Sequence, residues 1–283
     1  MRKIAIVLCI AFTFAFFLSC STPDFKDEYT TPSTTDTDPI TDPVTDPVTD
    51  PVTNPATEPV SEPESDFGKT DISLFTYRDT IGVNGTSFKE FTLPVVSIKG
   101  DKAREDIINA QIDAFCQSFF KRAVPNANSL VNGGAVIEFK IESCEYTLLP
   151  NSVLSVAFYS HTEFFNAGFE ELPERSFAAL NISLIDGKIL QGADIFTDLD
   201  KLKTDAGGFK FLTDNVPHAP SAAEISDAMA QYRADYMIFP YVYFTQSDAL
   251  VCVELTQLQG NYALVVIPFG NFGNYFTESF SLR

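Results

Sequence analysis

Residues that could carry catalysis are sparse in this sequence. Its two histidines, His161 and His218, lie far apart along the chain. No His-Glu-x-x-His run offers a metal site, and no Gly-x-Ser-x-Gly turn offers an activated serine. Residues 68–70 read Gly-Lys-Thr, like the end of a phosphate-binding loop, but Pro63 occupies the position of that loop's first glycine. The sequence therefore predicts no enzymatic activity, no metal site and no cofactor.

The five cysteines offer little more chemistry. Cys9 and Cys20 lie near the start of the chain, and Cys116, Cys144 and Cys252 lie much further along. Because these last three are an odd number, at most one disulfide can form among them and one thiol is left over. Their spacings match no zinc or iron–sulfur pattern. We expect these three cysteines to be buried free thiols.

One segment combines carboxylates with large apolar side chains. Residues 161–174 read HTEFFNAGFEELPE, and the pattern predicts a long irregular insertion between two strands. Such insertions are uncommon in compact domains unless they have a function. We therefore expect a candidate ligand-binding loop here. Its candidate binding residues are Glu163, Phe164, Phe165, Phe169, Glu170, Glu171 and Glu174.

The elements that must position this segment follow from the apolar pattern. Strands are predicted over 71–81, 88–98, 136–142, 153–160, 176–190 and, as three strands, within 237–269. The strand within 176–190 runs into Asp186-Gly187, a strong tight-turn signal. Asp101 is the expected N-cap of a helix that Pro125 closes. That helix presents an apolar stripe of Ile108, Ile112, Phe115 and Phe119. Residues 197–233 lack alternation and are expected to be helical, in two pieces broken near Pro217 and Pro220.

This order of elements indicates the fold class. Strands outnumber helices, and the helices interrupt the strands rather than alternate with them. The sequence therefore predicts an α+β fold in which helices pack on an antiparallel sheet.

The chain is strongly acidic. It has a formal charge of −19 over 283 residues, and residues 66–283 carry 27 acidic against 16 basic side chains, a net charge of −11. This charge argues against nucleic acid or anionic lipid headgroups as partners of the folded part. It is compatible with a cationic partner.

The first residues predict secretion. Arg2 and Lys3 precede an uncharged apolar run over 4–18, which is shorter than the ~20 residues of a membrane-spanning helix. Residues 1–19 are therefore expected to be a signal peptide. Leu18-Ser19-Cys20 resembles the lipobox of bacterial lipoproteins, a family in which the cysteine is acylated and becomes the first mature residue. That resemblance implies a lipidated, palmitate-bearing Cys20 that attaches the protein to a membrane on the extracytoplasmic side.

A proline repeat follows the lipobox. From Asp38 a proline recurs at every fourth residue up to Pro63, and no aromatic residue lies between Tyr29 and Phe67. Each proline fixes its own backbone and pushes the preceding residue toward extended geometry. We predict that residues 20–65, with the lipidated cysteine at their start, form a disordered acidic stalk. The stalk carries an α+β binding or sensing domain over 66–283.

Three longer segments carry a further resemblance, which covers about residues 75–275. They are LPVVSIKGDKAREDIINAQIDAF (93–115), VLSVAFYSHTEFFNAGFEELPERSFAALNISLIDGKILQGADIF (153–196) and DALVCVELTQLQGNYALVVIPFGNF (248–272). They are similar to the extracytoplasmic domain shared by lysozyme-sensing anti-sigma receptors and the non-catalytic N-terminal part of some peptidoglycan deacetylases. Members of that family often carry Gly-Gly-Ala-His-Pro in the middle loop, where this chain has Asn-Ala-Gly-Phe-Glu at 166–170. The resemblance therefore implies the fold, but not a ligand that this motif would recognise.

Together these features predict a lipid-anchored extracytoplasmic lipoprotein of the cell envelope that binds or senses a ligand. The family resemblance and the acidic charge favour a cationic protein such as lysozyme. A cell-wall module that binds peptidoglycan and a hydrolase with an unrecognised site are the alternatives. Exposed aromatic side chains in a groove would favour the glycan, and a deep pocket with converging carboxylates of perturbed pKa would favour the enzyme.

Overall fold

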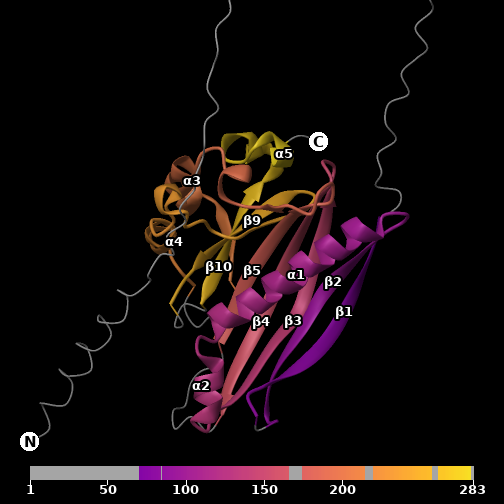
Figure 1. Cartoon of the computed structure of the whole chain (residues 1–283). Coiled ribbons are helices and arrows are strands. Elements are labelled where there is room, and N and C mark those ends of the chain that lie inside the picture. The colour runs from indigo at the N-terminus through magenta and orange to yellow at the C-terminus, as the bar shows by residue number, and fades with distance from the viewer. Residues whose placement is uncertain (1–69, 84, 166–173, 214–218, 257–260, 282–283) are drawn as a thin grey trace, which may run out of the picture. The chain divides into compact units, whose positions relative to one another are not determined.

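The computed structural model describes residues 70–83, 85–165, 174–213, 219–256 and 261–281. These residues build two β-sheets and the helices that pack on them (Figure 1). The predicted signal peptide, the predicted lipidation site Cys20 and the predicted stalk lie outside them. His218 and three residues of the candidate loop, Phe169, Glu170 and Glu171, lie outside them as well.

Six strands form the first sheet in the order β1-β2-β3-β4-β5-β6. They are β1 (Thr70–Ile81), β2 (Ser87–Ile98), β3 (Val136–Leu149), β4 (Val153–Phe165), β5 (Glu174–Ser183) and β6 (Ile189–Leu190). Neighbouring strands of this sheet are antiparallel, except that β2 and β3 pair in parallel over 88–91. Parallel neighbours need a long crossover, and here it contains α1 (Lys102–Ala123) and α2 (Ala127–Asn132).

Helix α1 begins and ends where the sequence predicts. The Asp101 side chain caps it, accepting a hydrogen bond from the backbone N of Arg104 at 3.0 Å. Its last residue is Ala123, two positions before Pro125, which has no backbone N–H to continue the helix. The predicted stripe faces the sheet, and Ile108 has no exposed surface. The helix therefore lies across one face of the first sheet (Figure 1).

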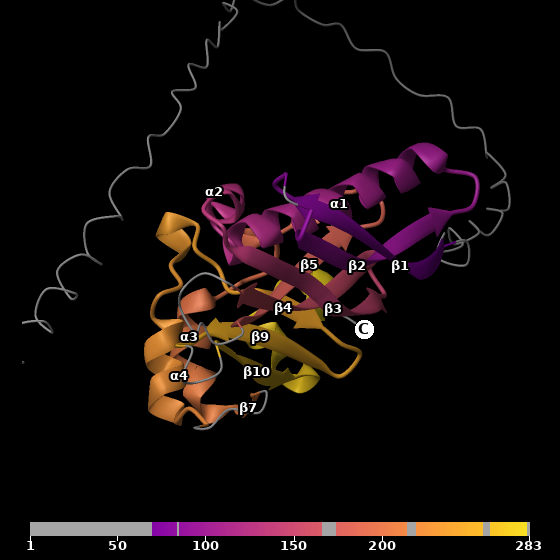
Figure 2. The same cartoon turned by 90° about the horizontal axis from the view of Figure 1, so that it is seen from below.

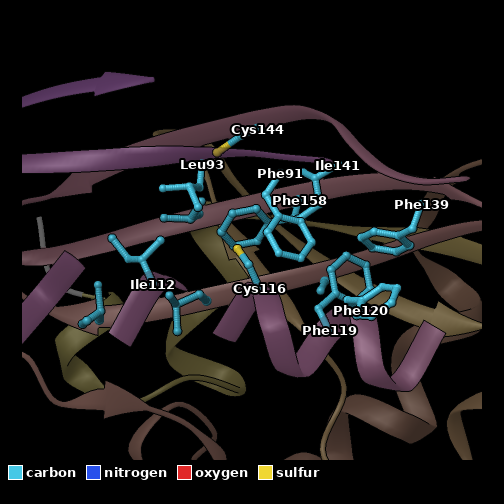
Figure 3. Close-up of a cluster of buried hydrophobic side chains, with 14 of the residues drawn as sticks. Phe91, Leu93, Ile112, Cys116, Phe119, Phe120, Phe139, Ile141, Cys144 and Phe158 are labelled. Carbon is cyan, nitrogen blue, oxygen red and sulfur yellow. The ribbon is translucent and has the colours of Figure 1, made fainter. Parts of the chain in front are cut away.

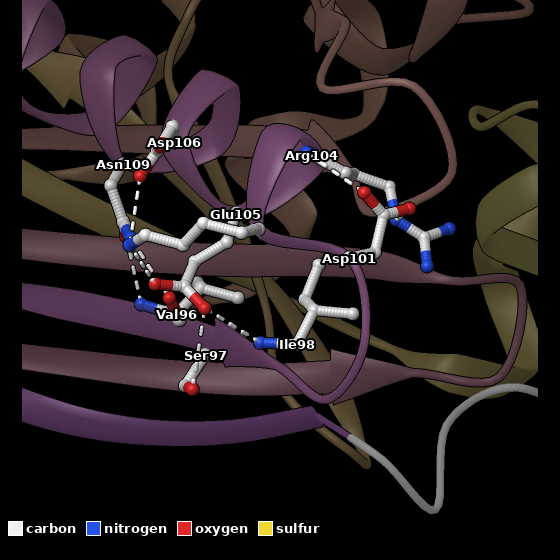
Figure 4. Close-up of polar contacts among 9 residues, drawn as sticks. Val96, Ser97, Ile98, Asp101, Arg104, Glu105, Asp106 and Asn109 are labelled. Atoms are coloured by element: carbon white, nitrogen blue, oxygen red, sulfur yellow. Dashed lines mark hydrogen bonds and ion pairs between the residues drawn. The ribbon is translucent and has the colours of Figure 1, made fainter.

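Side chains of α1 also replace a missing strand beside β2 (Figure 4). The parallel pairing with β3 ends at residue 91. Beyond it, Asn109 Oδ1 accepts from the backbone N of Val96, and Asn109 Nδ2 donates to the Val96 carbonyl oxygen, both at 2.8 Å. One turn earlier, Glu105 Oε2 accepts from the backbone N of Ile98 at 3.2 Å. These bonds attach the helix to the sheet in one register.

The first hydrophobic cluster fills the space between α1 and this sheet (Figure 3). Phe139 of β3 packs edge-on against Phe91 and Phe120, with ring centroids 6.0 and 5.2 Å apart. Such pairs add to the free energy gained from buried area alone. The rings come from β2, β3 and α1, so they join the crossover to the sheet.

The cysteines within the described residues are buried and free, as predicted. Cys116 and Cys144 belong to the first cluster (Figure 3). Burial raises the pKa of the Cys144 thiol to about 12, and it also raises the pKa of Cys116 and of Cys252. These thiols are therefore protonated at neutral pH, which makes them poor nucleophiles and poor metal ligands.

Four antiparallel strands form the second sheet in the order β7-β10-β9-β8. They are β7 (Lys210–Leu212), β8 (Val242–Phe244), β9 (Asp248–Glu254) and β10 (Tyr262–Pro268). The remaining helices are α3 (Leu199–Asp205), α4 (Ala222–Met229), α5 (Glu278–Ser281) and the 3₁₀ turns η2 (Gly192–Asp194), η3 (Ala206–Gly208), η4 (Ala234–Tyr236) and η6 (Phe269–Asn274).

Alternation along β9 and β10 gives the second sheet two apolar faces. One face, with Val251 and Val265, packs in a cluster with residues of α3, α4 and α5. The other face, with Cys252 and Tyr262, packs on β4 and β5 of the first sheet. Figure 2 shows α1 on one side of the first sheet and the second sheet on the other. The first sheet is therefore covered on both faces along β4 and β5.

Two buried polar residues join the sheets at β8, which is an edge strand. Asn181 Nδ2 donates to the Val242 carbonyl oxygen at 2.8 Å, and the backbone N of Phe244 donates to Ser155 Oγ at 2.9 Å. Ser155 and Asn181 are almost fully buried. They satisfy outward-facing backbone groups of β8 that no neighbouring strand reaches, as buried polar groups require.

The predicted α+β class, with helices on an antiparallel-rich sheet, is confirmed. The structure adds a second sheet and one parallel pair. The expected irregular insertion over 161–174 is wrong at both ends, because 161–165 belong to β4 and Glu174 begins β5. The reason is pairing: β3 extends far enough for Val136 to pair with Phe165.

Three further expectations are corrected. The strand within 176–190 ends at Ser183, earlier than expected, and the tight turn predicted at Asp186-Gly187, with Gly187 at φ 73°, separates it from β6. Within 237–245 only β8 is a strand. The region 197–233 contains β7 as well as helices, because residues 210–212 find a partner in β10. Each correction involves a strand of only two or three residues; β6 and β8 pair with the strands next to them in the sequence, whereas β7 pairs with the distant β10.

Candidate functional site

Two adjoining cavities lie at the junction of α1 and the two sheets. Chamber 1, about 380 Å³, is bordered by the last turns of α1, the start of β5 and the facing ends of β9 and β10. Chamber 2, about 390 Å³, is bordered by β5, β6 and the segment 231–242. Arg122, Tyr241 and Glu254 line both chambers and form what we call the shared wall. Volumes of this size suit small-molecule ligands.

Three separate elements bring these residues together. Arg122 lies in the last turn of α1, Tyr241 directly precedes β8, and Glu254 ends β9. The backbone N of Cys252 donates to the Tyr241 carbonyl oxygen at 2.8 Å, which holds Tyr241 beside β9. The Arg122 guanidinium carbon lies 5.1 Å from the centroid of the Tyr241 ring, and Phe115 meets that ring edge-on at 6.2 Å. A cation over an aromatic face is favourable.

Tyr232 and Tyr241 give the chambers buried hydroxyl groups. The Tyr232 hydroxyl donates to the Cys252 carbonyl oxygen and accepts from the backbone N of Glu254, both at 3.2 Å. Burial raises the pKa of both tyrosines, and the Arg122 cation opposes the rise at Tyr241. Both phenols are therefore neutral at physiological pH and suited to hydrogen bonding.

The charges on the shared wall are opposite and exposed. Neither Arg122 nor Glu254 forms an ion pair with another of the described residues. The wall therefore presents one guanidinium and one carboxylate to whatever occupies the chambers.

A third hollow, which we call the acidic groove, adjoins both chambers. It measures about 550 Å³ and carries the carboxylates of Glu224, Asp227 and Glu254. Glu224 and Asp227 come from α4, whose N-terminus is fixed by a capping box between Ser221 and Glu224. Glu254 thus lines the groove and both chambers.

An exposed apolar loop, which we call the apolar tip, borders the same region. Its residues Tyr236, Met237 and Ile238 are 63%, 80% and 48% exposed. Met237 adopts φ 56°, a left-handed conformation that is uncommon for a residue with a side chain. Met237 and Ile238 line chamber 2, and Gln231 lines both chamber 2 and the acidic groove. The tip, chamber 2 and the groove are therefore contiguous.

The predicted loop residues are only partly near this junction. Glu163, Phe164 and Phe165 lie at the end of β4, where Phe164 packs against the first cluster and Phe165 is 43% exposed. None of the three lines a chamber or the groove. Glu174 lines chamber 1.

His161 lies near the predicted loop residues and contacts acidic side chains. Its Nδ1 is 3.3 Å from Glu142 Oε1, and its Nε2 is 3.6 Å from Glu163 Oε1. The residues that line the chambers and the groove do not include it.

Sequence reasoning missed the residues of the shared wall. Arg122, Tyr241 and Glu254 form no motif, and Arg122 lies far along the chain from the other two. The only local signal was that each ends or precedes an apolar segment.

The described ranges contain neither a cluster of metal-ligating side chains nor a membrane-spanning helix. No group of three His, Cys, Asp or Glu side chains there is placed to hold a metal ion. Nor does any helix in those ranges combine the length and the hydropathy needed to cross a membrane.

Comparison with known proteins gives fold-level similarity alone. No family model matches the chain, and no curated protein matches it. A crystal structure of a DUF3298 family member from Bacteroides fragilis NCTC 9343 is similar with a TM-score of 0.44 and 14% identity, covering 74% of this chain and 94% of that one. A DUF3298 family protein from Pseudomonas aeruginosa PAO1 is similar with a TM-score of 0.40 and 9% identity, covering 75% of this chain and 95% of that one.

Proposed function

We propose that this chain is a lipid-anchored extracytoplasmic lipoprotein that binds or senses a ligand and is not an enzyme. The anchor rests on Leu18-Ser19-Cys20 and the uncharged run before it. The proposed partner is a cationic protein such as a lysozyme, which the described domain meets outside the cytoplasm.

The observation that carries this partner is the acidic groove next to the apolar tip. Glu224, Asp227 and Glu254 supply negative charge, and Met237 supplies an apolar side chain that is four-fifths exposed. Interface hot spots combine an apolar anchor with a polar rim. Complementary charge acts mainly on the association rate and on its dependence on salt. A basic protein surface fits both features.

A second candidate partner is peptidoglycan. Chamber 1 is lined by the aromatic side chains of Phe119, Phe177, Tyr241 and Tyr262. Aromatic walls in a hollow favour stacking on sugar rings. Binding to peptidoglycan needs no basic partner, so the two proposals can be separated by experiment.

Surface plasmon resonance with a basic lysozyme tests the first proposal. The chain from Ser21 onward, which lacks the lipidated cysteine, should bind at low ionic strength. Binding should weaken as salt shortens the Debye length to ~8 Å at physiological ionic strength. Asp227→Asn should slow association, and Met237→Ser should raise the Kd about fivefold, as expected for an interface residue worth about 1 kcal/mol.

Glu278→Gln is the matched control, because Glu278 is exposed on α5 and lines neither the groove nor a chamber. It should leave binding unchanged. Absence of binding at low salt, or binding that responds neither to salt nor to the groove and tip variants, would reject the cationic partner. Co-sedimentation with insoluble peptidoglycan under those conditions would instead support the second candidate.

A further inference from the structure

We propose that chambers 1 and 2 form a binding site for a small zwitterionic ligand, an amino acid or a short peptide with an apolar side chain. This ligand differs in kind from the protein partner proposed above, and the proposal does not depend on that partner, although Glu254 also lines the acidic groove. Three features of the chambers favour such a ligand: the charges of the shared wall, an unsatisfied buried amide and the apolar wall of chamber 2.

The shared wall presents the two charges that a zwitterion requires. Arg122 and Glu254 line both chambers, and neither is ion-paired within the described residues. A guanidinium binds a carboxylate in a planar, two-pronged geometry. The Glu254 carboxylate can accept from an ammonium group. A ligand with both groups therefore satisfies both residues at once.

A buried amide in chamber 2 has unused hydrogen-bonding capacity. Asn181 is 2% exposed and lines chamber 2. Its Nδ2 donates to the Val242 carbonyl oxygen, which can only accept, so the orientation of the amide is determined. Its Oδ1 has no hydrogen-bond partner among the described residues. Buried polar atoms are rarely left unpaired, and an N–H donor of a ligand would satisfy this one.

The remaining wall of chamber 2 suits an apolar side chain. Ile189, Leu190, Ile195 and Phe239 line it. Phe239 is held by ring stacking on Phe196, with centroids 6.0 Å apart and planes at 10°. Gly192 lies directly beneath it: a Cβ there would be 2.7 Å from the Phe239 ring. The ring position therefore depends on a glycine at 192, and the wall has a defined shape.

Isothermal titration calorimetry with four leucine derivatives tests the proposal on the chain from Ser21 onward. L-Leucine carries both charges, N-acetyl-L-leucine only the carboxylate, L-leucinamide only the ammonium, and N-acetyl-L-leucinamide neither. We expect L-leucine to bind tightest. Loss of either charge should weaken binding on the order of tenfold, since hydrogen bonds to charged groups contribute about 1.5 kcal/mol or more.

Two variants test which residue binds the carboxylate of the ligand and which binds its ammonium group. Arg122→Gln should remove the difference between L-leucine and L-leucinamide, and Glu254→Gln should remove the difference between L-leucine and N-acetyl-L-leucine. Lys121→Gln and Glu278→Gln are the controls, because both residues are exposed and line neither chamber. They should leave all four affinities unchanged.

Three results would overturn the proposal. They are no binding of L-leucine at millimolar concentration, equal binding of all four compounds, and charge discrimination that persists in both variants. Circular dichroism of each variant checks that it is folded. The outcome is independent of the lysozyme experiment, which uses a different ligand and different test variants and shares only the control Glu278→Gln.

Discussion

Replacing Asn109 with Ala tests how α1 is attached to the first sheet. Asn109 makes two reciprocal hydrogen bonds of 2.8 Å to the backbone of Val96, at a point where β2 has left β3 (Figure 4). Alanine removes the donor and the acceptor together while keeping a residue that favours the helix. The Val96 N–H and C=O then have no partner from α1.

The expected cost follows from these two bonds. A buried backbone group that loses its partner costs about 1–3 kcal/mol. Because Asn109 is only half-buried, water can partly compensate, so we use the lower part of that range for each group. The variant should lose about 2–3 kcal/mol of unfolding free energy, a large fraction of the ~5–15 kcal/mol of a typical domain.

Urea denaturation measures this loss. Asn109→Ala should lower the midpoint while the slope stays unchanged, because the surface exposed on unfolding is the same. Gln111→Ala is the control: Gln111 is exposed on the same helix, and its loss should shift stability by less than about 0.5 kcal/mol. If Asn109→Ala proved as mild as Gln111→Ala, the account of α1 as a substitute strand would be wrong.

Three further predictions address packing, thiols and the anchor. Gly207→Ala should destabilise by about 1–3 kcal/mol in thermal or urea unfolding, since a Cβ there would lie 2.5 Å from Ser226 Oγ and 2.8 Å from a backbone oxygen of α4. Gly208→Ala, which meets nothing within 4 Å, should be tolerated, and equal effects at the two glycines would contradict the packing. Because burial raises the pKa of Cys144 to about 12, the native thiols should resist iodoacetamide at pH 8, and stability should decline as pH rises from about 9 toward 12, where only the unfolded thiols ionise. Rapid native alkylation would argue against this. Cys20→Ser should abolish metabolic labelling with a palmitate analogue, and labelling that persisted would exclude lipidation at Cys20.

The parts of the fold predicted correctly depend on local signals. The N-cap Asp101, the apolar stripe that includes Ile108 and the stop before Pro125 lie within one stretch of chain, so their periodicity identifies α1. The parallel pairing of β2 with β3 and the continuation of β4 to Phe165 depend on strands that meet only in the folded protein. Local alternation carries no information about either.

The residues of the candidate site could not be predicted from the sequence, for a related reason. The sequence favours the predicted loop because phenylalanines and glutamates cluster within 161–174. In the structure Phe164 lies partly against the core, whereas the unpaired charges that matter are Arg122 and Glu254. Whether a charged residue is paired, and whether an amide such as Asn181 has an unused oxygen, depends on neighbours from other elements. Those neighbours are set by the packing of the two sheets.

Hydrogen–deuterium exchange tests the proposed function most directly. The chain from Ser21 onward is compared with and without a basic lysozyme at low ionic strength. We expect new protection over 222–238, which covers α4 and the apolar tip, with no change over β1 and β2. Absence of protection, or protection confined to β1, β2 or the end of β4, would contradict the assignment of the acidic groove and the apolar tip as the binding surface.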